Sequence, residues 1–492
     1  MRFGFDNSYA RLPDRFFARV APSKVSAPRL LRVNRELAEL LGLDPDALAS
    51  PEGVAVLAGN AVPEDADPIA LAYAGHQFGN FVRLGDGRAI LLGEIVGKDG
   101  RRRDVQLKGA GRTPFSRGGD GRAALGPVLR ELLVSEAMHA LGIPTTRTLA
   151  AVLTGDPVAR EEMLPGAVLT RVAASHVRIG TFELLASAGD REGLATLAAY
   201  ALARHYPEAA GAAESPALAL LEQVVAAQAD LVAKWLGVGF VHGVMNTDNV
   251  AVSGETLDYG PCAFLDEYDP AKRFSYIDRG GRYAYANQPR IALWNLARLA
   301  EALLDLLHED EETAVRIATE RLDAFPPRFA ASRAAVFRAK VGLAREEEGD
   351  VALVEDLLGR LAASRVDFTR FFRRLADVAE GAEDGGAEKA VAAMFDDAQV
   401  FHTWAEAWRS RLAREQASPA ERARAMRAAN PAFVPRNHRV EEAIVAAHQG
   451  DLAPTEQLAR VLARPFEDQP EAAHLAEPPR PEERVEVTFC GT

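Results

Sequence analysis

Two short motifs hold the residues best able to do chemistry. They are His242-Gly-Val-Met-Asn-Thr-Asp-Asn and, nine positions after Asn249, Asp258-Tyr-Gly. Asn249 and Asp258 offer the oxygen ligands that Mg²⁺ prefers. We expect a hairpin over residues 250–257 to bring the two side chains together. The alternative is an Asn/Asp-rich loop between helices without a chemical role.

The spacing of the first motif is typical of nucleotide-dependent phosphotransferases of the kinase class. These enzymes carry a catalytic Asp two residues after a His, an Asn five residues after that Asp, and a later Asp-Phe-Gly. His242 and Asn249 match this spacing, but Val244 stands where the catalytic Asp is expected and cannot accept a proton. Asp248 is the only nearby carboxylate that could replace it as the general base.

A phosphate-binding segment is indicated further upstream. In Gly85-Asp-Gly87-Arg88 the two glycines would let backbone N–H groups approach a phosphate closely. A hairpin turn is the simpler interpretation, because Asp-Gly is typical turn chemistry and the third glycine of a kinase loop is replaced by Ile90.

Lys108 ends a β-like run 23 residues after Gly85, about the length of two strands and a turn. It is either a solvated strand end or an ammonium group over the phosphates, tied to a glutamate of the next helix. That helix is expected from Pro127 to just before Gly142. It offers Glu131 and Glu136, and helical periodicity favours Glu136 as the buried partner. On this evidence both remain open.

Arg171 and Arg178 form a further candidate pair. Seven residues apart, they would share one face if the segment were helical, and their guanidinium forks suit phosphate oxygens. The alternative is a solvated helix face.

The order of elements predicts an α+β protein with a kinase-like, two-lobed architecture. Residues 1–68 are expected to form an N-terminal extension with a short helix at residues 30–41. A small β-rich lobe with one key helix should follow at 69–172, and a helical lobe with the chemical motifs at 173–310. Within the latter, apolar spacing predicts helices at 217–236 and 291–307. Residues 311–492 are expected to be a helical extension and tail.

Composition excludes several classes of protein. There are 57 Lys and Arg against 70 Asp and Glu, a formal net charge of −13, which argues against a nucleic-acid protein held by a general basic field. Two cysteines cannot build a disulfide-rich scaffold. The sequence starts without an apolar signal region and holds no uncharged apolar run of membrane length. We therefore expect a cytoplasmic protein without nucleic-acid or membrane partners.

Several long motifs in order resemble the selenoprotein O family. They are Tyr73-Ala-Gly-His-Gln-Phe-Gly-Asn, Gln106-Leu-Lys-Gly-Ala-Gly-Arg-Thr-Pro-Phe-Ser-Arg, Glu136-Ala-Met-His-Ala-Leu-Gly-Ile-Pro-Thr-Thr-Arg and the two motifs after His242. The resemblance runs from about Phe5 to about Asn295 and reappears at Asn430-Pro and near the C-terminus.

The resemblance implies a protein-kinase-like fold that binds ATP in a flipped orientation and transfers AMP to hydroxyl side chains of proteins, with Mg²⁺ or Mn²⁺. It implies that Lys108 and Glu131 hold the phosphates, which contradicts the periodicity argument for Glu136. The other implied roles are nucleotide binding by Gly85, Gly87, Arg88, Asp120 and Gly121, terminal-phosphate binding by Arg171 and Arg178, general base at Asp248, and metal binding by Asn249 and Asp258. A kinase that uses Asp248 and an ATP-binding pseudokinase are the competing functions, and UTP is an alternative donor.

The only two cysteines, Cys262 and Cys490, suggest a redox switch. Cys262 lies just after Asp258-Tyr-Gly, and Cys490 lies where eukaryotic members of the resembled family carry selenocysteine. We expect a reversible Cys262–Cys490 disulfide that holds the tail over the cleft. The simpler alternative is a buried, inert Cys262 and an incidental Cys490.

Overall fold

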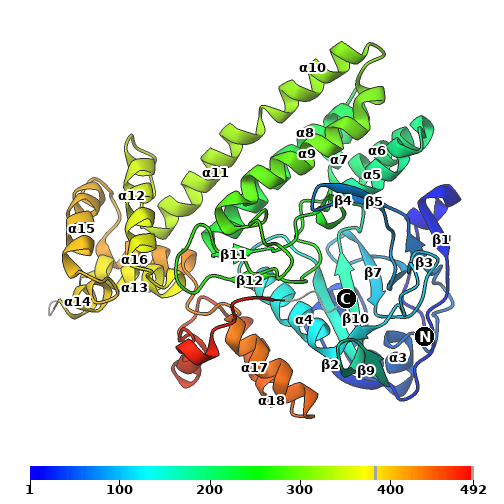
Figure 1. Ribbon diagram of the computed structural model, residues 1–492, viewed down its shortest axis with the longest axis horizontal. Helices are drawn as coiled ribbons and strands as arrows, with labels where there is room; N and C mark the ends of the chain where they lie inside the picture. The colour runs from blue at the N-terminus through cyan, green and yellow to red at the C-terminus, as the bar shows by residue number, and fades with distance from the viewer. Residues whose placement is uncertain (382–384, 489–492) are drawn as a thin grey trace.

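The computed structural model describes residues 1–381 and 385–488, and it is an α+β structure (Figure 1). Its first part contains an antiparallel sheet and its last part is helical. Between the two lie the segments that carry the chemical motifs.

The sheet positions the candidate phosphate-binding residues. Its strands follow the order β1 (Phe17–Arg19), β3 (Ile69–Leu71), β6 (Ala89–Val96), β7 (Arg102–Lys108), β10 (Met163–Ala173), β9 (Arg147–Ala159) and β2 (Arg29–Val33), with β8 (Ala123–Ala124) beside β10. In the antiparallel registers, Lys108 is opposite both Ala89 and Leu169. Lys108 therefore ends a central strand rather than a solvated edge.

The first 68 residues differ from the prediction. The expected helix over residues 30–41 is wrong in its first part, because β2 pairs with β9 and only α1 (Arg35–Leu40) is helical. The Asn34 side chain accepts a hydrogen bond from the Leu37 N–H, so Asn34 is the N-cap that separates strand from helix. Strands β1 and β2 thus make this segment part of the sheet.

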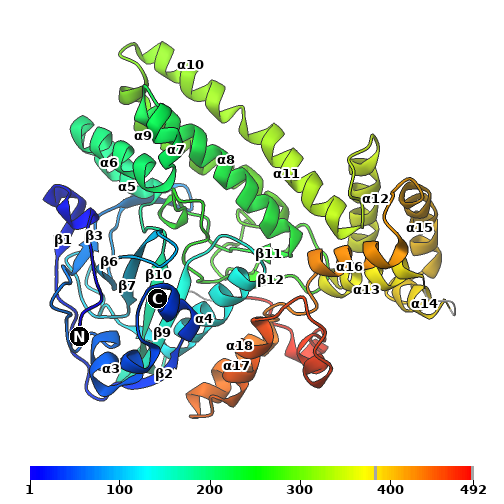
Figure 2. The same ribbon diagram turned by 180° about the vertical axis from the view of Figure 1, so that it is seen from behind.

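Helix α4 (Leu125–Ala140) is buried on almost all sides. One side packs on β9 and β10, and another packs on α17 (Asn437–His448) and α18 (Ala453–Leu462), which lie beside it in both views (Figures 1 and 2). Such a helix has no single apolar stripe, so periodicity could not choose between its two glutamates.

The predicted helices of the central region are confirmed as α8 (Pro216–Gly237) and α9 (Gln288–Leu307). Among the described residues, α8 alone has the length and hydropathy of a membrane span, but 56% of its most apolar window is buried. Its neighbours are α6 (Arg191–His205), α9 and α11 (Phe325–Lys340), so α8 is a core helix of this fold.

The remaining elements surround this frame. The short strands are β4 (Ala74–Gln77), β5 (Asn80–Arg83), β11 (Phe240–Val241) and β12 (Ala263–Phe264). The other helices are α2 (Pro45–Ala49), α3 (Pro51–Leu57), α5 (Ile179–Ser187), α7 (Pro207–Ala212), α10 (Glu311–Leu322), α12 (Asp350–Ala363), α13 (Phe368–Glu380), α14 (Gly386–Ala392), α15 (Ala398–Leu412) and α16 (Pro419–Ala429). Helices α12 to α16 form a cluster at one end of the molecule (Figure 1).

Candidate active site

The predicted site residues line two adjoining cavities. The larger, of about 580 Å³, is lined by Gly85, Gly87, Arg88, Lys108, Asp120, Gly121, Arg171, Arg178, Asp248, Asn249 and Asp258. The smaller, of about 310 Å³, shares Arg88, Lys108, Asp248, Asn249 and Asp258 with it and adds Glu131. Residues that are up to 173 positions apart in sequence therefore meet in one place.

Lys108 is paired with Glu131 rather than with Glu136. Its ammonium nitrogen lies 2.7 Å from a Glu131 carboxylate oxygen and also contacts Asp258. Glu136 instead accepts hydrogen bonds from the Arg147 guanidinium at 2.9 and 2.7 Å and from Thr148 N–H. Five residues correspond to about 140° around a helix, so the two glutamates face different sides of α4.

Arg171 completes this buried ion-pair cluster. Its guanidinium contacts Glu131 and donates to Asp258 Oδ1 at 2.9 Å. Burial alone would raise the pKa of Asp258, but the charges of Lys108 and Arg171 hold it well below its usual range. Burial likewise opposes ionisation of Glu131, whose pKa is nevertheless lowered by Arg171 and Lys108. Both carboxyl groups are therefore ionised at neutral pH.

Arg178 is held by residues that the sequence motifs did not single out. Its guanidinium lies 3.2 Å from Asp86 Oδ1 and stacks on the Tyr73 ring at 4.2 Å, while its Nε is buried without a hydrogen-bond partner among the described residues. Asp86 also accepts hydrogen bonds from Gln106 and Leu71 N–H. The only signal for Asp86 was its place inside Gly85-Asp-Gly87.

The expected helical face for Arg171 and Arg178 is wrong. Arg171 belongs to strand β10, and Arg178 is the N-cap of α5. Both are almost fully buried, so the alternative of a solvated face is wrong as well. They line the same cavity because the chain turns between the strand and the helix.

Asp248 lies in a 3-10 turn, Thr247–Asn249, beneath the β4–β5 hairpin. The hairpin is attached to this loop by hydrogen bonds from His76 N–H to Thr247 and from Phe78 N–H to Asn246. A Cβ atom at Gly75 would collide with the Asp248 carboxyl group, so only glycine permits this approach. Burial raises the pKa of Asp248 to about 6, and its Oδ1 has no partner within the described chain.

The glycine segment at 85–88 is not a hairpin turn, because β5 pairs with β4 and not with β6. Gly85 has a φ of +106°, and a Cβ atom there would collide with the ring of Phe115. Thr113 donates to the Asp86 carbonyl at 2.6 Å and Ser116 to that of Gly87. The loop before Gly121 is therefore fastened to the glycine segment.

Asn249 and Asp258 have the chemistry of a hard-cation site. The Asn249 amide nitrogen donates to the Val244 carbonyl at 3.1 Å, so the amide oxygen is the atom of this side chain that could coordinate a cation. Asp258 is ionised, and Lys108 and Arg171 both contact its Oδ1 rather than its Oδ2. The hairpin expected between the two is supported by an antiparallel bridge between Val250 and Thr256. One amide and one carboxylate oxygen fit a divalent cation that takes its other ligands from phosphate and water.

The cavity of about 580 Å³ carries an excess of positive charge, although the net charge of the chain is −13. Eight lysine and arginine side chains line it, against four aspartates, namely Asp86, Asp120, Asp248 and Asp258. The cations are Arg88, Lys108, Arg112, Arg117, Arg122, Arg160, Arg171 and Arg178. This distribution suits a polyphosphate.

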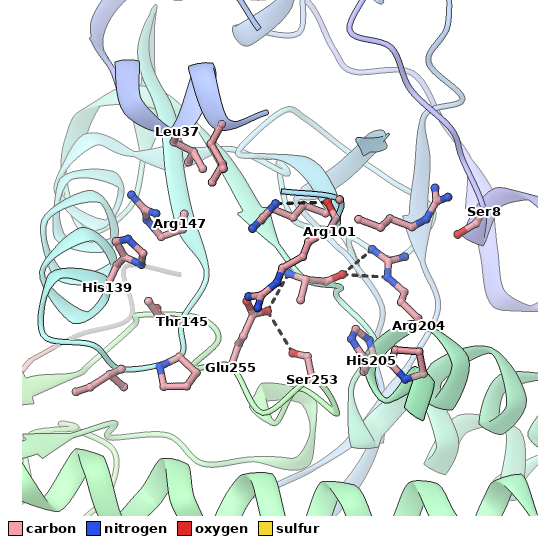
Figure 3. A pocket seen from close by; sticks show the side chains of 18 of the residues that line it. Ser8, Leu37, Arg101, His139, Thr145, Arg147, Arg204, His205, Ser253 and Glu255 are labelled. Atoms are coloured by element: carbon pink, nitrogen blue, oxygen red, sulfur yellow. Dashed lines mark hydrogen bonds between the residues drawn. The ribbon is translucent and has the colours of Figure 1, made fainter. Parts of the chain in front are cut away.

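A third cavity, of about 1100 Å³, lies at the opposite end of β7 and β10 from the candidate site (Figure 3). Glu255 and Arg204 point into it from two different elements and hold the same residue between them. Glu255 accepts a hydrogen bond from Ala174 N–H at 2.9 Å, and Arg204 donates to the Ala174 carbonyl at 2.6 Å. Ala174 lies on the stretch between Arg171 and Arg178.

Cys262 is buried, and burial raises the pKa of its thiol to about 12. Cys490 lies outside the described residues, so the expected disulfide stays a prediction. The described part of the tail does return to this region, since the Thr488 hydroxyl donates to the Pro261 carbonyl at 2.6 Å.

Comparisons with known proteins find relatives over the whole length of the chain. A family model described as "Protein adenylyltransferase SelO" matches residues 1–463. A protein of Methylorubrum populi named "Protein nucleotidyltransferase YdiU" is 63% identical over 495 residues, covering 100% of this chain and 99% of the relative. Proteins of the same name from Bradyrhizobium diazoefficiens and Rhodopseudomonas palustris (strain BisB5) are 61% and 60% identical, covering 100% of both chains in each case.

Proposed function

Since this chain belongs to the SelO family of protein adenylyltransferases and is a nucleotidyltransferase, we propose that it transfers AMP from ATP to hydroxyl groups of protein side chains and releases pyrophosphate. Serine, threonine and tyrosine are the proposed acceptors, in a protein-kinase-like fold of two lobes. A cytoplasmic location stays a prediction. The observation that carries the proposal is the pair of adjoining cavities that Lys108, Glu131, Asp258 and Asp248 line together. The buried Oδ1 of Asp248 has no hydrogen-bond partner among the described residues.

The phosphates would be held by buried cations on both sides of the cavity. Lys108, positioned by Glu131, would bind one phosphate, and Arg178 would bind the terminal phosphate together with Arg171. The Arg178 Nε supports this role, because it is buried without a partner in the described part of the chain and such a donor is costly unless a ligand satisfies it. With the terminal phosphate held there, the α-phosphorus is the atom left to meet an acceptor.

Asp248 would accept the proton of the acceptor hydroxyl. The hydroxyl oxygen attacks the α-phosphorus, the bond from that phosphorus to the bridging oxygen of the β-phosphate breaks, and pyrophosphate leaves with the electron pair. A pKa of about 6 keeps the Asp248 carboxylate mostly ionised at pH 7 yet basic enough to take a proton. Asn249 and Asp258 would hold Mg²⁺ or Mn²⁺, which supplies positive charge that neutralises the phosphates.

Incubation with ATP labelled at the α- or at the γ-phosphate tests the proposal. We expect label to reach protein acceptors from the α-position only. Transfer from the γ-position would make the protein a kinase, and transfer from neither would make it a nucleotide-binding scaffold. The same assay with labelled UTP decides which nucleotide is the better donor.

A further inference from the structure

Helix α17 contacts α4, which carries Glu131, and also β12, which follows Asp258 in the chain. Its Glu441 forms an ion pair with Arg130, the residue directly before Glu131 on α4. Near its start, the Asn437 side chain donates to the Phe264 carbonyl at 3.0 Å and accepts from Phe264 N–H at 3.3 Å. Phe264 lies on β12, six residues after Asp258. Helix α17 therefore connects α4, which carries Glu131, with residues 258–264, which follow from Asp258 to β12.

The contact between α17 and α4 is apolar around this ion pair. Arg130 is only 8% exposed, so its guanidinium charge depends on Glu441 for compensation. A Cβ atom at Gly126 would lie 3.1 Å from the Ile444 side chain, so the two helices approach closely. The shared core consists of Val128, Leu129, Leu132, Leu133, Val440, Ala443, Ile444, Ala447, Leu458, Val461 and Leu462. Helix α4 cannot shift or rotate without opening this packed interface.

We propose that α17 is a positioning element for nucleotide transfer and that Glu441, through Arg130, fixes the place of Glu131 opposite Lys108 and Asp258. The inference rests on the proposed function. Glu441 touches no reacting atom, so its effect is expected on the geometry of the Lys108–Glu131 pair and hence on turnover.

The test begins with Glu441→Arg, which puts two cations together at the interface. We expect kcat for transfer of α-labelled AMP to fall about tenfold to a hundredfold, the scale of a small misplacement at a reacting centre. The KM for ATP should change less than about threefold, because Arg178, which is expected to hold the terminal phosphate, pairs with Asp86 and not with Glu131. The reversed pair, Arg130→Glu with Glu441→Arg, should recover most of the lost turnover, whereas each single variant should not.

Glu442→Arg is the matched control. Glu442 is the next residue on α17, has an exposed side chain and pairs with Arg439 of its own helix, so the same charge change should leave kcat unaltered. Amide hydrogen exchange of residues 125–140 and 258–264 should accelerate in Glu441→Arg and stay unchanged in Glu442→Arg. If Glu441→Arg does not fold, Glu441→Gln replaces it, with the same direction of effect.

Two results would overturn the positioning role alone, provided that the wild-type protein transfers label from α-labelled ATP. One is a Glu441→Arg variant with unchanged turnover, and the other is a reversed pair that does not recover turnover. Absence of α-label transfer by the wild-type protein overturns the proposed function. In that case hydrogen exchange still decides whether α17 holds α4 and the Asp258 segment.

Discussion

At the scale of single residues, Asp248 makes the site dependent on pH. As a general base it works only when ionised, and burial raises its pKa to about 6. We therefore expect kcat/KM for AMP transfer to increase as pH rises through about 6 and to level off above that value. A profile without a change near pH 6, measured at constant ionic strength, would remove Asp248 from this role.

Substitution of Asp248 separates binding from chemistry. Asp248→Asn keeps the size of the side chain but cannot take a proton, so transfer should slow by the 10²–10⁴-fold typical of a lost general base. The affinity for ATP, measured by calorimetry, should change less than about threefold, since the phosphates are expected to bind elsewhere. Equal losses of affinity and turnover would contradict this assignment.

Substitution of Arg178 tests whether the terminal phosphate of ATP lies against this residue. Loss of its charge-assisted bonds in Arg178→Ala should weaken ATP by roughly 1.5–3 kcal/mol and leave AMP almost unaffected, because AMP lacks a terminal phosphate. Arg178 is the better choice than Arg171, which also holds Glu131 and Asp258. Calorimetric titration with both nucleotides gives the answer, and equal weakening of both would place Arg178 elsewhere.

Asp258→Ala tests the proposed cation site. The change removes the only carboxylate of the expected ligand pair, so the Mg²⁺ or Mn²⁺ dependence of nucleotide binding should disappear together with transfer. ATP titrations with and without the divalent ion measure this dependence. A variant whose ATP affinity still responds to the ion would locate the cation at other ligands.

The sequence was most informative where candidate site residues lie a few positions apart in the chain. The short motifs could predict that Asn249 and Asp258 line one cavity, because a tight hairpin joins them whatever the surrounding fold. Glu131 could not be derived this way, since α4 is buried on opposite sides and its periodicity is lost. The anchors of Arg178, namely Asp86 and Tyr73, depend on contacts between segments about 90 to 105 residues apart.

At the scale of elements, Glu255 in the third cavity holds the stretch between β10 and α5 through its hydrogen bond with Ala174. Burial raises the pKa of Glu255 to about 7, against an ordinary value of 4.5. The folded protein therefore holds this proton more tightly than the unfolded chain, and wild-type stability should decrease as pH rises from about 4.5 to about 7.

Glu255→Gln stays neutral and can still accept the Ala174 N–H bond. Relative to wild type, its free energy of unfolding should increase between pH 5 and pH 8, by on the order of 2 kcal/mol. Denaturant unfolding at the two pH values measures this, with the exposed Glu442→Gln as control. A difference that does not vary with pH would show that Glu255 is ionised in the folded protein.

The periodicity of apolar residues predicted helices that bury one face, but it did not identify the short strand β2. Helices α8 and α9 have a clear apolar stripe and were found within three residues at each end. Strand β2 was mistaken for helix because its apolar residues fit either period over so few positions. Its partner β9 lies more than 110 residues later, so the strand conformation of β2 depends on pairing within the folded sheet.

At the scale of the whole molecule, the tail returns to the segment after Asp258 through Thr488, close to Cys262. Transfer activity with and without reductant, in wild type and in Cys490→Ser, tests the predicted Cys262–Cys490 switch. We expect reduction to raise the activity of wild type only, and the buried Cys262 thiol predicts that the bond forms slowly. Two free thiols under oxidising conditions would exclude the switch.

The ion pair between α4 and α17 joins residues 311 positions apart in the chain. During synthesis the strands, the glycine segment and the chemical motifs all leave the ribosome before the helices that cover the outer side of α4. A nascent chain can thus hold every residue expected to contact the nucleotide and still lack the support that orders Glu131. We therefore expect transfer activity to require α17, although no residue of α17 is expected to contact the nucleotide.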